Sequence, residues 1–201
     1  MASIKDMYLN PMRRFSMVSI SAPSGSGKTT LINKLVNTCP KFEFSISATT
    51  REPRGEEKNG KDYYFMTIPQ FEKKVVRGDF LEWEMVYNNV YYGTLKSEIT
   101  RIKDNGNIPI LDVDVKTALR LKRKYPNDIY TVFVKCPSMA ELEKRLRDRK
   151  TDSDFAIRER LMKASVELGY EDEFDNIVVN GNVEDAFDDL SSSVWDAVNY
   201  Y

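Results

Sequence analysis

The chain has 201 residues, of which 41% are hydrophobic, so it can bury one proper core and we expect one domain with appendages. Its 30 lysines and arginines nearly balance 31 aspartates and glutamates. The resulting net charge of −1 provides no field that would draw the protein onto nucleic acid or an anionic membrane. The absence of histidine excludes imidazole bases, Ser-His and Cys-His nucleophile pairs, and most zinc sites.

The cysteines and the hydropathy pattern predict the compartment. Cys39 and Cys136 are far apart in the sequence and form no C-x-x-C pattern, which favours reduced thiols in a cytosolic protein. No run of about 18 apolar residues occurs, so we expect no membrane span. We therefore expect a soluble, cytoplasmic protein that binds anions through local clusters of residues, and its oligomeric state stays open.

The first predicted elements are a strand, a loop and a helix. An alternating apolar strand at 17–21 is followed by A-P-S-G-S-G-K-T at 22–29, which matches the phosphate-loop motif G-x-x-x-x-G-K-[ST] with Ala22 at its first position. Apolar residues then recur at helical spacing from Thr29 to about Cys39, and Pro40 ends the helix. A plain turn is the alternative, but the flanking strand and helix favour nucleotide binding.

Each loop residue has a physical role in that interpretation. Gly25 and Gly27 allow the backbone to turn its N–H groups toward a polyphosphate at a helix N-terminus. Lys28 would neutralise the β and γ phosphates, and the Thr29 hydroxyl would reach Mg²⁺. The full set expected at the phosphates is Ser24, Gly25, Ser26, Gly27, Lys28, Thr29 and Thr30.

The middle of the chain predicts a β-rich insert. Phe42, Phe44 and Ile46 alternate as in a strand, and residues 49–60 form a polar segment without periodicity, which indicates an exposed functional loop. Aromatic residues and valines at 63–65 and 81–92 favour strands. Short helices are expected between these two segments, near 69–77, and after them, at 97–104.

The second half alternates strands and helices. Apolar runs at 108–113 and 131–134 predict buried strands, with a helix between them. The later elements expected are a helix opened by the capping box at Ser138 and running to about Arg149, a helix at 155–170, a strand at 177–179 and an amphipathic helix at 183–198. This alternation predicts an α/β fold, with a parallel sheet covered by helices on both faces.

Two further groups of residues carry chemistry. Asp112 ends a buried strand, where an acidic residue of a phosphate-loop protein orders the water around Mg²⁺, and Asp114 follows it. An N-cap for the next helix is the alternative role for an acidic residue at a strand end. Arg51 and Arg54, flanked by hydroxyls and Tyr63, can form a second phosphate site, with a solvated charged loop as the alternative.

From about Ser16 onward the chain resembles guanylate kinases, in the order and the spacing of several motifs. They are S-x-S-x-T-T-R-x-P-R at 45–54, N-G-x-x-Y at 59–63, E-W at 82–83, Y-Y-G-T at 91–94, L-D-V-D at 111–114 and R-L-x-x-R at 145–149. The resemblance implies a core of the phosphate-loop NTPase type at 1–45, 98–141 and 163–201. It also implies a small α+β monophosphate-binding insert at 46–97 and a helical lid at 142–162.

The resemblance also implies Mg²⁺-dependent transfer of the γ-phosphoryl group of ATP to GMP, with dGMP as an open alternative acceptor. The residues implied at GMP are Ser47, Arg51, Arg54, Tyr63 and Tyr92 on its phosphate, Glu82 and Thr94 on guanine, and Asp114 near the base. Those implied in catalysis are Lys28, Arg51, Arg145, Arg149 and Arg160, and Asn180 is implied at the adenine of ATP. Thr29, and Asp112 through water, are implied at the metal.

Some positions depart from the family pattern, and two other functions stay open. Glu56 stands where glycine is usual, so Glu57 matches the family's acidic residue, while Lys116-Thr117 and Lys150 replace small residues. A non-catalytic guanylate-kinase-like module that binds proteins is one alternative, although such domains usually lack the phosphate loop. A related kinase acting on another phosphorylated small molecule is the other, and Glu82 with Thr94 argues against it.

Overall fold

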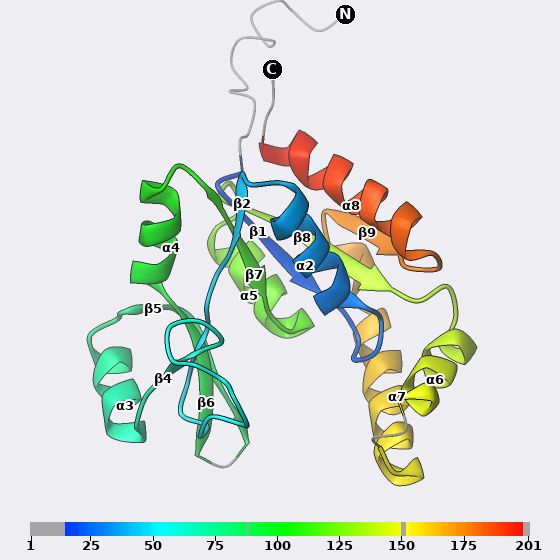
Figure 1. The fold of residues 1–201 in the computed structure, drawn as a ribbon, viewed down its shortest axis with the longest axis horizontal. Helices are drawn as coiled ribbons and strands as arrows, with labels where there is room; N and C mark the ends of the chain where they lie inside the picture. Colours follow the sequence, from blue (N-terminus) through cyan, green and yellow to red (C-terminus); the bar gives the residue numbers. More distant parts are fainter. Residues whose placement is uncertain (1–14, 88, 150–151, 199–201) are drawn as a thin grey trace, which may run out of the picture. The chain divides into compact units, whose positions relative to one another are not determined.

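The computed structural model describes residues 15–87, 89–149 and 152–198, and their backbone folds into two compact units. One unit combines residues up to 39 with those from 110 onward, and the other consists of residues 40–109. Figure 1 shows the course of the chain, coloured from the N-terminus to the C-terminus. The prediction for Lys150 concerns a residue outside the described ones.

The first unit is built on parallel strands in the order β7-β1-β8-β9. They are β1 (Met17–Ser21), β7 (Ile108–Asp112, whose first two residues fall in the other unit), β8 (Ile129–Lys135) and β9 (Asn176–Val179). Every residue of β1 is buried, because helices cover both faces of the sheet. The register pairs Ile20 with Asp112, so these strand ends lie beside the loop that follows β1.

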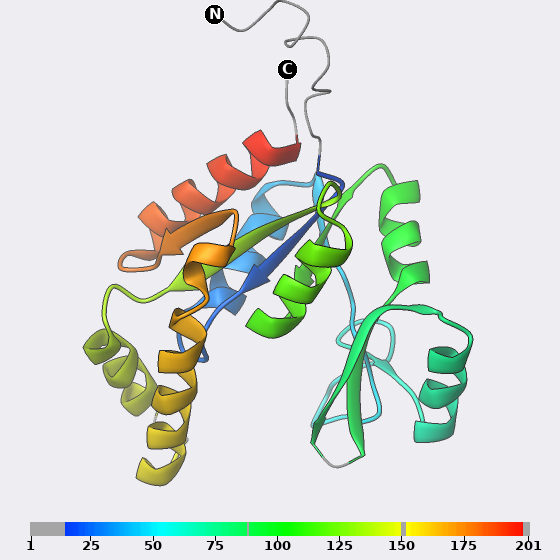
Figure 2. The ribbon, with the colours of Figure 1, turned by 180° about the vertical axis from the view of Figure 1, so that it is seen from behind.

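Helices cover this sheet from both sides. As Figures 1 and 2 show from opposite sides, α2 (Lys28–Thr38) and α8 (Val183–Val198) lie on one face and α5 (Val115–Lys124) on the other. Leu31 and Leu35 of α2 and Leu190 of α8 are fully buried. Beyond β8, α6 (Met139–Asp148) and α7 (Asp154–Leu168) share a separate apolar cluster, and a 3₁₀ turn (Glu171–Glu173) leads to β9.

The second unit has its own sheet and core. It begins with β2 (Phe42–Phe44), and its four-stranded sheet has the order β4-β3-β6-β5. The strands of that sheet are β3 (Ala48–Thr49), β4 (Tyr64–Phe65), β5 (Phe80–Tyr87) and β6 (Val90–Leu95), and the helices are α3 (Ile68–Val76) and α4 (Lys96–Asp104). Phe71 of α3 is fully buried and stacks on Phe80 with ring centroids 4.3 Å apart. Its core therefore consists of its own side chains.

The structure confirms the α/β class with a parallel sheet, and the last helix has the predicted bounds. It corrects the strand expected through Ile46, because β2 ends at Phe44 and the Ile46 amide donates instead to the carboxylate of Glu98 at 3.1 Å. The two-residue strand β3 was not predicted, since so short a run has no readable periodicity. The predicted insert at 46–97 lies within the second unit, and its separation from a lid at 142–162 stays a prediction.

Candidate functional site

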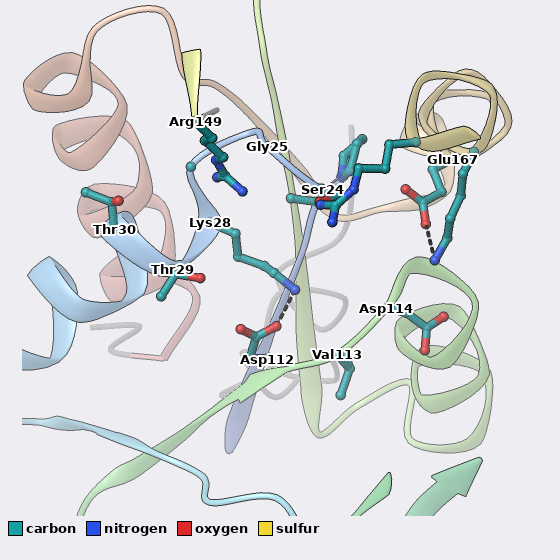
Figure 3. Close-up of a pocket in the computed structure, with 15 residues that line it drawn as sticks. Ser24, Gly25, Lys28, Thr29, Thr30, Asp112, Val113, Asp114, Arg149 and Glu167 are labelled. Atoms are coloured by element: carbon teal, nitrogen blue, oxygen red, sulfur yellow. Dashed lines mark hydrogen bonds and ion pairs between the residues drawn. The ribbon is translucent and has the colours of Figure 1, made fainter. Parts of the chain in front are cut away.

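A cavity of about 440 Å³ opens in the first unit beside the loop that follows β1 (Figure 3). It is lined by residues from four parts of that unit: the loop and the start of α2, the end of β7, the end of α6, and α7. They are Ala22, Pro23, Ser24, Gly25, Gly27, Lys28, Thr29, Thr30, Asp112, Val113, Asp114, Arg149, Arg160, Lys163 and Glu167. Most of the residues predicted at the phosphates and the metal therefore surround one space.

The backbone of the loop has the conformation that its glycines permit. Gly25 and Gly27 have φ angles of 101° and 87°, a left-handed region that other residues rarely adopt. Gly27 is also the N-cap of α2, and a Cβ atom there would lie 2.3 Å from the side-chain amide nitrogen of Asn180. The unpaired N–H groups of the first turn of α2 thus open toward the cavity, which is the arrangement that binds phosphate.

Lys28 and Asp112 form an ion pair within the cavity, as Figure 3 shows. Lys28 begins α2 and Asp112 ends β7, so the pair joins the phosphate loop to the neighbouring strand. Thr29 and Thr30 follow on the first turn of α2 and also line the cavity. A cationic residue and two threonines therefore lie at the N-terminus of α2, beside the cavity.

The donor set fits Mg²⁺ held largely through a nucleotide. The structure describes no group of three or more acidic or cysteine side chains that could hold a metal ion. Thr29 and Asp112 do supply one hydroxyl and one carboxylate at the cavity. Mg²⁺ commonly keeps several waters and binds through one or two carboxylates together with substrate phosphates, so this set suits it.

Asp114 has the capping role that we kept as the alternative for Asp112. Its carboxylate accepts hydrogen bonds from the amides of Lys116 and Thr117, at 2.9 and 3.1 Å, at the start of α5. Asp112 instead pairs with Lys28. Asp114 lines the cavity as well, and its predicted place near guanine stays a prediction.

The structure brings two of the three predicted lid-region arginines to the cavity. Arg149 and Arg160 line it, and Arg160 donates to the Ser24 hydroxyl at 2.8 Å and to Asp152 at 3.2 Å. Arg145 is not part of the lining, since its guanidinium is bonded to Glu141 at 2.8 Å and to the Gly181 carbonyl at 3.3 Å. The catalytic role of Arg145 stays a prediction.

Lys163 and Glu167 also line the cavity, although no sequence motif indicates them. Their side chains are 3.6 Å apart, and burial raises the pKa of Glu167 against the opposing effect of Lys163. Together with Arg160 they are spaced by three and four residues, which places them on one face of α7. That spacing is the signal that could have identified them.

Asn180 lies behind the phosphate loop, with 1% of its surface exposed. Its side-chain amide donates to the carbonyl of Ser26 at 2.8 Å, while its Oδ1 accepts no hydrogen bond from any residue the structure describes. The contact to adenine stays a prediction. What the geometry adds is a direct tie between this side chain and the loop.

In the second unit, Arg51 is the centre of a cluster of predicted residues. It makes a two-pronged pair with Glu57 at 2.9 and 3.0 Å, donates to the Tyr92 hydroxyl at 3.1 Å, and lies 5.1 Å from the centre of the Tyr63 ring. The hydrogen bonds that Arg51 donates to Glu57 raise the pKa of Arg51 and lower the pKa of Glu57. The residues thus hold a fixed positive group beside two phenol side chains.

Glu82 and Thr94 face each other across strands β5 and β6. The register pairs them directly, and the Thr94 hydroxyl donates to Glu82 Oε1 at 2.7 Å. Tyr92 lies two residues from Thr94, so it shares that face of the sheet. Gly93 between them allows the strands to approach, because a Cβ atom there would lie 2.7 Å from the Glu82 carbonyl oxygen.

The other two residues predicted at the GMP phosphate belong to the same unit. Ser47 is partly buried, and its carbonyl accepts from the Tyr64 amide at 2.9 Å. Arg54 is exposed, and its backbone amide donates to Glu57 at 2.7 Å. Glu57 therefore ties the backbone at Arg54 to the side chain of Arg51.

Comparison with known proteins decides the family. The family model described as guanylate kinase matches residues 14–197. The chain belongs to the guanylate kinase family. It is 46% identical over 180 residues to guanylate kinase of Myxococcus xanthus, covering 89% of this chain and 85% of that protein. It is 42% identical over 179 residues to the enzyme of Fusobacterium nucleatum, covering 89% and 95%.

A solved structure agrees with the family assignment. The guanylate kinase of Anaplasma phagocytophilum matches this fold with a TM-score of 0.70 and 27% identity, over 90% of this chain and 85% of that one. The resemblance seen in the sequence motifs is therefore confirmed. Among the described helices, none has the length and apolar character needed to cross a bilayer.

Proposed function

We propose that this guanylate kinase family member transfers the γ-phosphoryl group of ATP to GMP in a Mg²⁺-dependent reaction, giving ADP and GDP. The observation that carries the proposal is the cavity in which the phosphate loop, Lys28, Arg149 and Arg160 converge. The acceptor is already a phosphate oxyanion, so the reaction needs no general base, in keeping with a chain that has no histidine. Positioning and charge stabilisation supply the catalysis.

On the donor side, the backbone of the loop and the start of α2 bind the phosphates of ATP, and Lys28 meets the β and γ phosphates. Lys28 is already held at the cavity by Asp112, so little reorganisation is needed for it to reach a phosphate. Thr29 and, through water, Asp112 would hold Mg²⁺. A bound ion would supply positive charge that neutralises the phosphates.

The arginines act on the group in transfer. Arg149 and Arg160 reach the cavity from the end of α6 and from α7. The hydrogen bond from Arg160 to Ser24 holds one guanidinium beside the phosphate loop. Their charges meet the negative charge that the transferred group spreads over its oxygens, which lowers the barrier more than it strengthens binding.

On the acceptor side, Arg51, Tyr63 and Tyr92 form the phosphate site, together with Ser47 and Arg54. Glu82 reads guanine, because its carboxylate can accept from the N1–H and 2-amino donors on one edge of that base. Thr94 orients Glu82 by its hydrogen bond and keeps lone pairs for the base. Adenine presents an acceptor at N1 to this carboxylate and is rejected.

A coupled assay of ADP release tests the proposal. The protein is given ATP and Mg²⁺ with GMP, dGMP, IMP or AMP, and Lys28→Met serves as the inactive control. We expect ADP release to be faster with GMP than with the other monophosphates. GMP binding without turnover would favour the protein-binding module instead, and preference for another phosphorylated acceptor would favour a different kinase of this fold.

A further inference from the structure

Glu98 is a buried carboxylate in the second unit that has no part in the proposed reaction. It lies in the first turn of α4, and 1% of its side chain is exposed. An ionised carboxylate is costly to remove from water unless hydrogen bonds or an opposite charge compensate it. Its burial therefore has to be explained by the groups that it binds.

Both oxygens of Glu98 accept two hydrogen bonds each. Arg101 donates to Oε2 at 2.9 Å and to Oε1 at 2.8 Å, the Ile46 amide donates to Oε1 at 3.1 Å, and the Tyr64 hydroxyl donates to Oε2 at 2.8 Å. Burial alone would raise the pKa of Glu98, but the hydrogen bonds from Arg101, Tyr64 and the Ile46 amide outweigh burial and lower it. Glu98 is therefore an anion at neutral pH.

The two partners other than Arg101 lie next to residues of the proposed GMP-phosphate site. Ile46 immediately precedes Ser47, and Tyr64 immediately follows Tyr63. The Tyr64 amide also donates to the Ser47 carbonyl at 2.9 Å. A single carboxylate thus joins two segments that are separated by the exposed loop at 51–62 and that each carry a phosphate-site residue.

We propose that Glu98 is a positioning residue for the acceptor phosphate, which sets the spacing between Ser47 and Tyr63. This inference rests on the proposed function, because it concerns the phosphate site assigned there. A stabilising role alone would not require a charge, since well-packed apolar residues often replace buried ion pairs without loss of stability. The hydrogen bonds from the Ile46 amide and the Tyr64 hydroxyl fix two chain segments to one carboxylate, which an apolar side chain cannot do.

Arg101 extends this arrangement without touching the phosphate site. It donates to Glu43 at 2.7 Å, and Glu43 also accepts from the Asn107 side chain at 2.8 Å. Glu43 therefore belongs to the same charge network, but the hydrogen bonds from Ile46 and Tyr64 go to Glu98 and not to Glu43. Glu43→Gln is a matched control, because it removes one carboxylate charge next to Arg101 and leaves the hydrogen bonds from Ile46 and Tyr64 to Glu98 in place.

Steady-state kinetics of Glu98→Gln, Tyr64→Phe and Glu43→Gln test the proposal. Glu98→Gln should raise KM for GMP about tenfold, on the scale of a lost hydrogen bond to a charged group, with KM for ATP unchanged and kcat within about threefold. KM for IMP should rise by the same factor, because the base is read elsewhere. Tyr64→Phe should raise KM for GMP by a smaller factor, and Glu43→Gln should leave it unchanged.

Melting temperatures separate positioning from stability. If Glu98→Gln and Tyr64→Phe lower the melting temperature but leave KM for GMP unchanged, the positioning role is wrong; Tyr64→Phe serves alone if Glu98→Gln does not fold. If the unaltered protein shows no turnover, the proposed function fails. Calorimetric titration with GMP then decides the role of Glu98, because equal affinity in all variants would overturn it and weaker affinity in Glu98→Gln would support it.

Discussion

The two proposed substrate sites are built in different ways. In the first unit, the anion site consists mainly of backbone from consecutive residues of the phosphate loop, directed by two glycines and the N-terminus of α2. In the second unit, it consists of side chains between Ser47 and Tyr92 that meet only in the folded sheet. A site made of local backbone can be recognised in a short motif, whereas a site made of distant side chains depends on the packing around it.

The sites share one device. Each holds its central cation with a carboxylate of the same unit, Lys28 with Asp112 and Arg51 with Glu57. The cations are thus in place before a phosphate binds, so substrate binding does not have to order them. The difference lies in what supports each pair, a strand end in one case and an exposed loop in the other.

The sharpest expected effect concerns the second unit and its choice of base. GMP should be used better than IMP, which lacks the 2-amino donor, and AMP should be used about four orders of magnitude less well than GMP, because adenine presents an acceptor at N1 to the Glu82 carboxylate. Glu82→Gln should reduce the difference in specificity constant between GMP and AMP. Glu84→Gln, on the same face of β5, is the control. Specificity constants for the three monophosphates measure it. AMP turnover within tenfold of GMP in the unaltered protein would contradict the base-reading role.

Lys28→Met tests whether the first site works independently of the second. Turnover should fall about a hundredfold or more, since one charge-stabilising contact in a preorganised site is lost. GMP affinity should be unchanged. Lys34→Met, on the same helix but paired with Glu184 outside the cavity, should keep normal turnover. A correctly folded Lys28→Met protein with near-normal kcat would remove this lysine from the mechanism.

Arg149 and Arg51 should differ in the kinetic constant that they control. Arg149→Ala should lower kcat on the order of tenfold to a hundredfold, because its charge acts on the transferring group. Arg51→Ala should act mainly through KM for GMP, whose phosphate keeps its charge throughout. Steady-state kinetics with each substrate varied in turn will separate them. An Arg149→Ala variant that raised only KM for GMP would show that its assignment is wrong.

Asn180→Ala should have the smallest effect on kinetics of these changes. It tests how far the phosphate loop depends on the hydrogen bond from Asn180. Loss of the hydrogen bond to the Ser26 carbonyl should weaken the binding of ATP about tenfold or less. Inorganic tripolyphosphate, which has no base, should lose affinity by a similar factor as a competitive inhibitor. Asn182→Ala, which removes a cap at the start of α8, is the control. Unchanged inhibition by tripolyphosphate would mean that Asn180 acts through adenine alone.

Features that depend on neighbours along the chain can be predicted from the amino-acid sequence. The phosphate loop with its flanking strand and helix could be read from residues 17–39, because glycine conformation and helix N-termini are local properties. The same holds for the start of α6, where Ser138 accepts from the Glu141 amide at 3.1 Å as its capping box predicts. The order of the later motifs identified the family.

The contacts between distant side chains, by contrast, are visible only in the folded protein. The tertiary structure placed Arg149, Arg160, Lys163 and Glu167 at the cavity, bound Arg145 elsewhere, and made Asp114 the helix cap in place of Asp112. In the folded protein the Ile46 amide lies outside the predicted strand and donates a hydrogen bond to Glu98, 52 residues away. Contacts at such separations leave no periodicity in the sequence, because they are selected by the packing of whole elements and by the need to pair every buried polar group.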